Sequence, residues 1–345
     1  MEISMSFLID TQNLFKLACR NIFQKNILTV KPSSSFHNYI NRLNNIGFLN
    51  IIFQKYTINK SIVVYILALE EISKISILHS SIMHIYNVFY YYPISLTGTS
   101  FHINRILSVI KLSKKINVLF LVDNFNICEY QLHFIVDGKI LIKRKKITFF
   151  LLYAKNSKTI FLINYPYFGI SYKTQHLILS NCYIHKKFTV KLNTQSRFFF
   201  IKLLKFHNIG VSSQALGLTI GHYNSMIKYY NKASFLNTNK TLLYTIKNKL
   251  LDIKLEIDQA KLINLKSAKI LNNLNKTLKI SIISRLVCLK LAVKTIKSTI
   301  DILNILENSH NSVDKILYTK VKLLKVYQLS SNIQKQILSF NILEE

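Results

Sequence analysis

The sequence predicts an α+β fold with a small N-terminal α/β domain, a mainly β middle region and a mostly α-helical C-terminal extension. Short apolar or alternating runs bounded by Asn, Gly or Lys fill residues 116–163, and apolar residues at helical spacing fill the chain past Asn193. Of 345 residues, 50% are hydrophobic and only seven are Gly and three Pro. Such a chain is too apolar and too poor in helix breakers to be disordered.

Residues 1–88 are expected to form the small α/β domain, which would bind RNA. Ser33, Ser34 or Ser35 can cap its second helix, and Gly47 can end that helix. The expected order is a helix over 14–22, a strand over 27–30, a helix over 36–47, and strands over 48–53 and 62–69.

The middle of the chain is expected to be mainly β, with an insertion over 89–153 and the remainder of the β domain over 154–188. The expected strands cover 116–122, 130–136, 139–142, 147–153 and 159–163. Asp137-Gly138, between the second and third of these, predicts a tight hairpin turn.

The C-terminal part is expected to form a basic helical region over 189–305 and an amphipathic helical tail over 306–345. Helical spacing continues over 243–257 and 262–274, with breaks at Asn272-Asn273. The apolar stripe of the tail, from Val313 to Tyr327, can dock on another protein or pack within the same chain. Both alternatives stay open.

The charge balance points to an anionic partner. Lys and Arg number 46 against 15 Asp and Glu, a formal net charge of +31. No Asp or Glu occurs from Gly138 to Leu251, so this stretch is expected to face a polyanion such as nucleic acid. The candidate RNA-binding residues are Lys16, Arg20, Ser33, Ser34, Ser35, Lys143, Arg144, Lys145, Lys146, Lys173, Lys186, Lys187, Lys294 and Lys297.

Patterns for catalysis or metal binding are missing from the sequence. The four cysteines are isolated, and the ten histidines lack metal-ligand spacing. Glu70 and Glu71 would project in different directions from a helix, and the glycines form no phosphate-binding loop. We therefore expect no enzyme, no cofactor, no metal and no small-molecule substrate. The longest apolar runs, 61–69 and 147–154, are too short to span a bilayer, so no integral membrane association is expected.

The basic residues also indicate an origin. Only six of the 46 are arginine, and enrichment in Lys, Ile and Asn is typical of an AT-rich genome. The N-terminus lacks the Arg-rich pattern of a transit peptide. We expect a protein encoded inside a mitochondrion, the alternative being a cytosolic protein of an AT-rich organism.

The segment from Asp10 to Asn21 resembles the opening helix of the small-subunit ribosomal protein eight family, with its Asp, Leu, Arg and Asn in register. The likeness continues through Pro32-Ser33-Ser34 to Gly47-Phe48. Tyr165-Pro166-Tyr167 stand where the family has a hydroxyl-rich turn. A weaker resemblance links residues 190–300 to small-subunit ribosomal protein thirteen.

The resemblance implies a structural constituent of the mitochondrial small ribosomal subunit, bound to the central-domain junction of its rRNA and to neighbouring ribosomal proteins in the matrix. Lysines would neutralise phosphates, and the serines at 33–35 would meet the shallow minor groove. The alternatives are an organellar RNA-processing or maturase-like protein and a basic membrane-surface assembly factor.

Overall fold

The computed structural model describes residues 14–22, 58–92, 118–123, 126–141, 149–154, 159–164, 170–173, 176–191, 196–235, 240–270 and 274–307, with single positions at 24, 43, 45, 47, 48, 51, 99, 101, 102 and 339. The chain forms two compact units. The first unit comprises Met1–Lys25, Gln54–His84 and Leu204–Glu345, and the second comprises Asn26–Phe53 and Ile85–Leu203.

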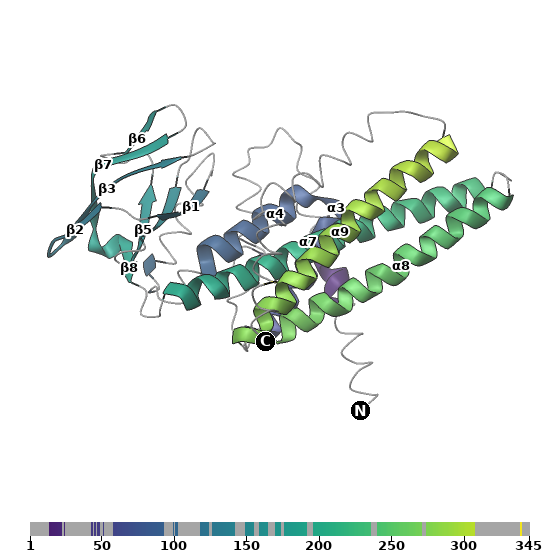
Figure 1. Cartoon of the computed structure of the whole chain (residues 1–345), viewed down its shortest axis with the longest axis horizontal. Coiled ribbons are helices and arrows are strands. Elements are labelled where there is room, and N and C mark those ends of the chain that lie inside the picture. The colour runs from purple at the N-terminus through teal and green to yellow at the C-terminus, as the bar shows by residue number, and fades with distance from the viewer. Residues whose placement is uncertain are drawn as a thin grey trace. The chain divides into compact units, whose positions relative to one another are not determined.

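The first unit is helical in its described part. Its main elements are α3 (Ile58–Ile75), α4 (Ile77–Ile85), α7 (Ser196–Phe235), α8 (Lys240–Lys269) and α9 (Leu274–Glu307), drawn as long ribbons in Figure 1. Residues 205–220 of α7 are buried on every side. A helix that is buried all round lies in the core, so α7 is the central helix of this unit.

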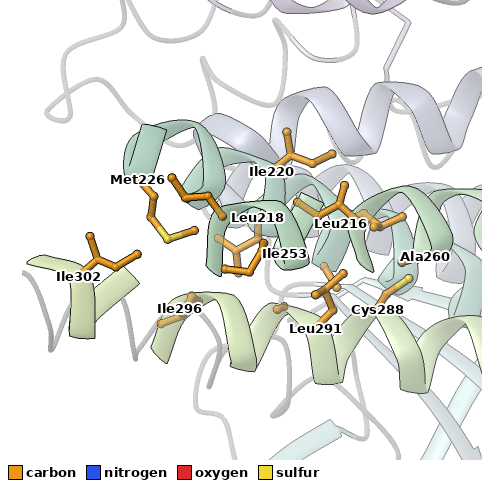
Figure 2. Packing of buried hydrophobic residues seen from close by; sticks show 14 of the residues in the cluster. Leu216, Leu218, Ile220, Met226, Ile253, Ala260, Cys288, Leu291, Ile296 and Ile302 are labelled. Carbon is orange, nitrogen blue, oxygen red and sulfur yellow. The ribbon is translucent and has the colours of Figure 1, made fainter. Parts of the chain in front are cut away.

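Apolar side chains of α7, α8 and α9, together with Ile77 of α4, make a core cluster of this unit. Figure 2 shows Leu216 and Met226 of α7 packed with Ile253 of α8 and with Cys288 and Leu291 of α9. The buried residues of α8 recur at helical spacing, so this helix is amphipathic and turns its other face outward.

Three glycines let α7 lie close to α3 and to α4, the helix that follows it. A Cβ added at Gly217 would run into the backbone carbonyl of Glu70, and one at Gly221 would lie 2.6 Å from the carbonyl oxygen of Lys74. A Cβ at Gly210 would overlap the ring of His84. The glycines are therefore used for helix packing.

Within its described residues, the second unit holds two four-stranded sheets. One has the order β1 (Val118–Asp123), β4 (Phe149–Ala154), β5 (Thr159–Asn164) and β8 (Thr189–Lys191); the other has the order β2 (Asn126–Glu129), β3 (His133–Leu141), β7 (His176–His185) and β6 (Ile170–Lys173). Only β1 and β4, among the described pairs, are parallel. The unit also contains the π-helix η3 (Tyr86–Tyr91) and the short η4 (Lys186–Phe188).

Several predicted elements are confirmed. Residues 14–22 are helical, and the strands expected over 116–122, 147–153 and 159–163 correspond to β1, β4 and β5. The second helix ends at Gly47 as predicted: its φ is 81°, and the Phe48 N–H donates to the Leu43 carbonyl at 2.9 Å. The C-terminal helices are also present, with the break before Leu274.

The strand predicted over 62–69 is wrong, because these residues lie inside α3. The five consecutive residues 65–69 are all buried. An apolar run that is buried on all sides carries no period, so it cannot be told from a buried strand by sequence.

The hairpin predicted at Asp137-Gly138 is also wrong, because β3 runs straight through both residues. Val136 pairs with Cys182 and Gly138 with Leu179, so two residues of β7 oppose one of β3. Asn181 takes a left-handed φ of 47°, and its N–H donates to the Asp137 carboxylate at 2.5 Å. The Asp137-Gly138 pair therefore marks a β-bulge and not a hairpin turn.

Other predictions lie outside the described residues: the strand over 27–30 and the tail beyond residue 307, apart from position 339. The predicted domain divisions at 88, 153, 188 and 305 stay predictions. Over the described part of the chain, no helix combines the length and apolarity needed to cross a membrane.

Candidate functional site

A cluster of polar side chains lies inside the helical unit, and we call it the buried polar cluster. It consists of Tyr65 of α3, His84 of α4, His207 and Asn208 of α7, and Arg285 of α9, none more than 7% exposed. The helices that carry these residues also bury many apolar side chains. Such polar groups are costly to bury without hydrogen bonds, so their partners define what the cluster does.

Tyr65, His84 and His207 form a hydrogen-bonded chain. The Tyr65 hydroxyl lies 2.6 Å from His84 Nδ1, and His84 Nε2 lies 2.9 Å from His207 Nδ1. The two imidazoles also stack, with ring centroids 5.1 Å apart. With the tyrosine as donor, His84 takes the Nε2–H tautomer and donates onward to His207, which satisfies both contacts with neutral rings.

Arg285 forms the other half of the cluster. Its Nη1 donates to Asn208 Oδ1 at 2.9 Å, and Asn208 Nδ2 lies 3.5 Å from the Ser281 hydroxyl. One turn further along α7, the Ser213 hydroxyl accepts a hydrogen bond from Asn264 Nδ2 at 2.8 Å. These contacts join α7 to α8 and α9 by polar groups as well as by apolar packing.

Burial sets the charge of every group in the cluster. It lowers the pKa of His84 to about 3, assisted by the positive charge of Arg285, and it lowers the pKa of His207 well below the ordinary value of 6.5. Burial raises the pKa of the Tyr65 hydroxyl and lowers that of Arg285 to about 10. At neutral pH the histidines and the tyrosine are uncharged and Arg285 carries the positive charge.

This arrangement can hold protons at defined atoms and can fix α4 against α7. The chain from Tyr65 to His207 offers two hydrogen bonds along which a proton could pass, but both histidines favour the neutral form. Its clearest effect is structural, because three helices share one fully buried polar network.

The neighbouring carboxylates are held in ion pairs. Glu70 accepts from Lys16 at 2.9 Å, and Glu71 accepts from Lys74 at 2.5 Å, with both glutamate side chains no more than 6% exposed. The Glu70 pair therefore connects the N-terminal helix to α3, and the Glu71 pair lies within α3.

The predicted RNA-binding residues that the structure describes belong to both units. Lys16 is engaged by Glu70, and Lys294 pairs with Glu256, so each has a carboxylate partner in its own chain. Lys186 lies 3.0 Å from the Glu129 carboxylate. Their predicted contact with phosphates stays a prediction, because an ion pair within the chain does not exclude it.

The remaining described residues of this prediction are divided between the two units. Arg20 and Lys297 are exposed on helices of the first unit, whereas Lys173 lies in β6 and Lys187 is exposed in η4 of the second. The other predicted positions, Ser33, Ser34, Ser35, Lys143, Arg144, Lys145 and Lys146, lie outside the described residues.

Sequence reasoning missed the buried polar cluster, since the histidines were treated as isolated. One signal was present: Arg285 is one of only six arginines and follows Ser-Ile-Ile-Ser in an apolar helical pattern. A charged residue on a core face needs buried partners, which pattern alone does not identify.

No family model matches the chain. A mouse protein, the mitochondrial short-chain specific acyl-CoA dehydrogenase, is 24% identical over 170 residues, which cover 49% of this chain and 41% of the mouse enzyme. The matched part is therefore less than half the length of that relative.

Solved structures match over nearly the whole chain. Butyryl-CoA dehydrogenase from Megasphaera elsdenii superposes with a TM-score of 0.77 at 15% identity, covering 97% of this chain and 98% of the other. A glutaryl-CoA dehydrogenase in complex with glutaryl-CoA gives 0.77 at 14% identity, covering 97% and 95%. A structure described as the electron transferring flavoprotein of Acidaminococcus fermentans gives 0.77 at 15%, covering 97% and 98%. The chain has the fold of acyl-CoA dehydrogenases.

These comparisons overturn the ribosomal prediction, together with the RNA-processing and membrane-surface alternatives. The expectation of a non-enzymatic protein is wrong, because the proteins that share this fold and the curated relative include dehydrogenases. The expected rRNA and ribosomal-protein partners and the expected lack of a small-molecule substrate are contradicted as well, since one matching structure holds glutaryl-CoA. The mitochondrial part of the expected location agrees with the description of the mouse enzyme, and the ribosomal part does not.

Proposed function

We propose that this protein is an acyl-CoA dehydrogenase-like flavoprotein that oxidises the acyl group of a coenzyme A thioester. The supporting observation is the fold, which agrees with butyryl-CoA and glutaryl-CoA dehydrogenases over 97% of the chain at a TM-score of 0.77. One matching structure is described as an FAD-dependent dehydrogenase, so the flavin we propose is FAD.

The charge of the chain suits both proposed ligands, because FAD and coenzyme A carry phosphates. The stretch from Gly138 to Leu251 contains many lysines and no carboxylate that would repel them. Lys187 and Lys228 are exposed cations of this stretch and are candidates to hold phosphate. When bound, the flavin would supply the hydride acceptor for the oxidation.

The two buried glutamates of α3, Glu70 and Glu71, are not assigned to catalysis. Removing a proton next to a thioester carbonyl requires a general base. Glu70 and Glu71 are already engaged by Lys16 and Lys74, so we assign them to the stability of the unit and not to this step.

Flavin binding can be tested by titrating the purified full chain with FAD and, as a matched control, with riboflavin, which lacks phosphate. Quenching of flavin fluorescence reports binding. We expect FAD to bind and riboflavin to bind at least about tenfold more weakly, with the difference shrinking at high salt because phosphate contacts are screened. Failure to bind FAD would refute a flavoprotein.

Oxidation is tested on the FAD-loaded protein under anaerobic conditions with butyryl-CoA and with longer saturated acyl-CoA esters. Loss of the visible flavin absorbance, together with formation of the 2-enoyl-CoA product, is the expected result. Bound FAD that stays oxidised with every ester, yet is reduced by dithionite, would show a flavin-binding protein that is not an acyl-CoA dehydrogenase.

A mitochondrial location belongs to the same proposal. It is supported by the description of the mouse relative as mitochondrial. Immunoblotting of purified mitochondria and cytosol from the source cells tests it, and signal confined to the cytosol would contradict it.

A further inference from the structure

The exposed large apolar side chains in the described part of the second unit adjoin its short helix η4. They are Phe101, Tyr130, Leu132 and Tyr183, which are 48%, 48%, 67% and 48% exposed. The Lys186 N–H of η4 donates to the Leu132 carbonyl at 3.0 Å, and Phe101 stacks on Phe188 with ring centroids 6.3 Å apart. We call these four residues the η4 surface. Exposed apolar side chains that gather in one place favour contact with a partner.

Two rings of the η4 surface are held in place although they are exposed. His133 lies between them, with ring centroids 4.7 Å from Tyr130 and 3.9 Å from Tyr183. The Tyr183 hydroxyl lies 2.8 Å from His133 Nδ1, and the Tyr130 N–H donates to the His133 carbonyl at 2.9 Å. Rings that are fixed before binding lose little rotamer entropy in a complex. Tyrosines of this kind are typical anchors of protein interfaces.

The cations beside these rings are also held by contacts. Lys186 Nζ lies 5.5 Å from the centroid of the Phe134 ring and 3.0 Å from the Glu129 carboxylate. Lys187 is exposed, and its Nζ lies 5.1 Å from the centroid of the Phe188 ring. These two lysines face one glutamate, so the charge beside the apolar side chains is positive. A complementary partner therefore carries carboxylates.

We propose that the η4 surface binds an acidic, apolar segment of another protein. Apolar side chains of that segment would pack on Leu132 and on the tyrosine rings, and its Asp or Glu side chains would meet Lys186 and Lys187. A nucleic acid fits less well, because it brings no aliphatic group for Leu132 and because the Glu129 carboxylate would repel its phosphates. The proposal depends neither on flavin binding nor on acyl-CoA oxidation.

The small number of anchors sets the expected strength. Interfaces that bury less than roughly 1,200 Å² in total are typical of weak and transient complexes. We expect a dissociation constant of about 1–100 μM for the proposed segment. Added salt should weaken the complex, because it screens the attraction between lysines and carboxylates.

Photo-cross-linking from position 132 identifies the partner. Leu132 is replaced by p-benzoylphenylalanine in the full chain, which is then irradiated in an extract of the source cells. The matched control carries the same amino acid at Leu78 of α4, which is 54% exposed in the other unit. We expect a protein adduct from position 132 and not from position 78. Mass spectrometry should locate the adduct in a segment rich in apolar residues and in Asp or Glu.

Binding of a labelled synthetic peptide of the captured segment, measured by fluorescence anisotropy, tests the residues. Tyr130→Ser with Leu132→Ser should weaken binding by about tenfold or more, and Lys186→Glu should weaken it several-fold. Leu78→Ser and Lys297→Glu change exposed residues of the helical unit and should leave binding unchanged. Far-ultraviolet circular dichroism checks that each variant is folded.

Several outcomes would overturn the proposal. They are an adduct on a second copy of this chain, an adduct on nucleic acid, and no adduct above that of the Leu78 control. A captured segment without carboxylates, or peptide binding that the paired Tyr130 and Leu132 substitutions leave unchanged, would overturn it too. Every variant keeps Lys187, which is also a candidate to hold a cofactor phosphate, so none of these outcomes bears on flavin binding.

Discussion

The substitution Gly210→Ala should destabilise the helical unit, although alanine is the better helix former. The added Cβ would overlap Cε1 and Nδ1 of His84 and would lie 3.2 Å from the Tyr65 hydroxyl. His84 is 3% exposed and is held by hydrogen bonds of 2.6 Å to Tyr65 and 2.9 Å to His207. The methyl group can be accommodated only if the ring or a helix moves.

The magnitude follows from the contacts that must change. Overpacking a close contact costs about 1–3 kcal/mol. Displacing the imidazole would also break buried hydrogen bonds, at about 1 kcal/mol each. Alanine is more favourable than glycine inside a helix by about 1 kcal/mol, which offsets part of this loss. The expected net loss in the free energy of unfolding of Gly210→Ala is therefore about 1–4 kcal/mol.

Urea unfolding followed by far-ultraviolet circular dichroism measures the loss, and a double-mutant cycle with His84→Ala assigns its cause. Removing the imidazole leaves space for the methyl group, so Gly210→Ala should cost nothing, or should stabilise, in the His84→Ala background. Neutral behaviour of Gly210→Ala in the native background would refute the packing argument. An equal loss in both backgrounds would show that His84 is not its cause.

Three further predictions concern charge and backbone. Burial lowers the pKa of His84 from 6.5 to about 3, so below pH 6.5 the unfolded chain takes up a proton that the folded chain does not, and stability is lost as the pH falls. In urea unfolding, the free energy of unfolding of His84→Gln should therefore depend less on pH, by about 1.4 kcal/mol per pH unit below 6.5. An unchanged pH dependence would contradict this. Lys16→Ala should cost about 1–3 kcal/mol in the same assay, because the buried Glu70 carboxylate loses its hydrogen bond and keeps a longer, 4.0 Å contact with Lys74. Adding Glu70→Leu should recover most of this loss, and unchanged stability of Lys16→Ala would contradict the argument. At the bulge, Asn181→Gly should unfold like the native chain, whereas Asn181→Val should lose about 1–2 kcal/mol, and equal stability of the two would rule out strain at this φ.

The sequence predicted elements best where apolar residues follow one period or stop at clear breakers. Helix α8 was predictable because its buried residues recur at helical spacing, and the strands β1, β4 and β5 were predictable because their apolar runs stop at clear breakers. The run at 62–69 lost its period because α3 is buried on every side over residues 65–69. A period cannot indicate a helix that has no exposed face.

The buried polar cluster was beyond reach for a different reason. His84 and His207 are 123 residues apart, and Arg285 is a further 78 residues along the chain. Only the approach of α4, α7 and α9 brings them together, and that approach depends on small residues such as Gly210. A sequence pattern shows which residues are polar but not which helices meet.

The wrong prediction of an rRNA-binding function arose because positive charge indicates an anionic partner but not its identity. The stretch from Gly138 to Leu251 does imply an anionic partner, but a phosphate is the same acceptor in a polynucleotide, a dinucleotide cofactor or coenzyme A. Part of the charge is also used inside the chain, as Lys16 with Glu70 and Lys186 with Glu129 show. The charge thus favours an anionic ligand without indicating which molecule carries the phosphate. The fold is that of acyl-CoA dehydrogenases, and one solved structure that shares it holds a coenzyme A ester.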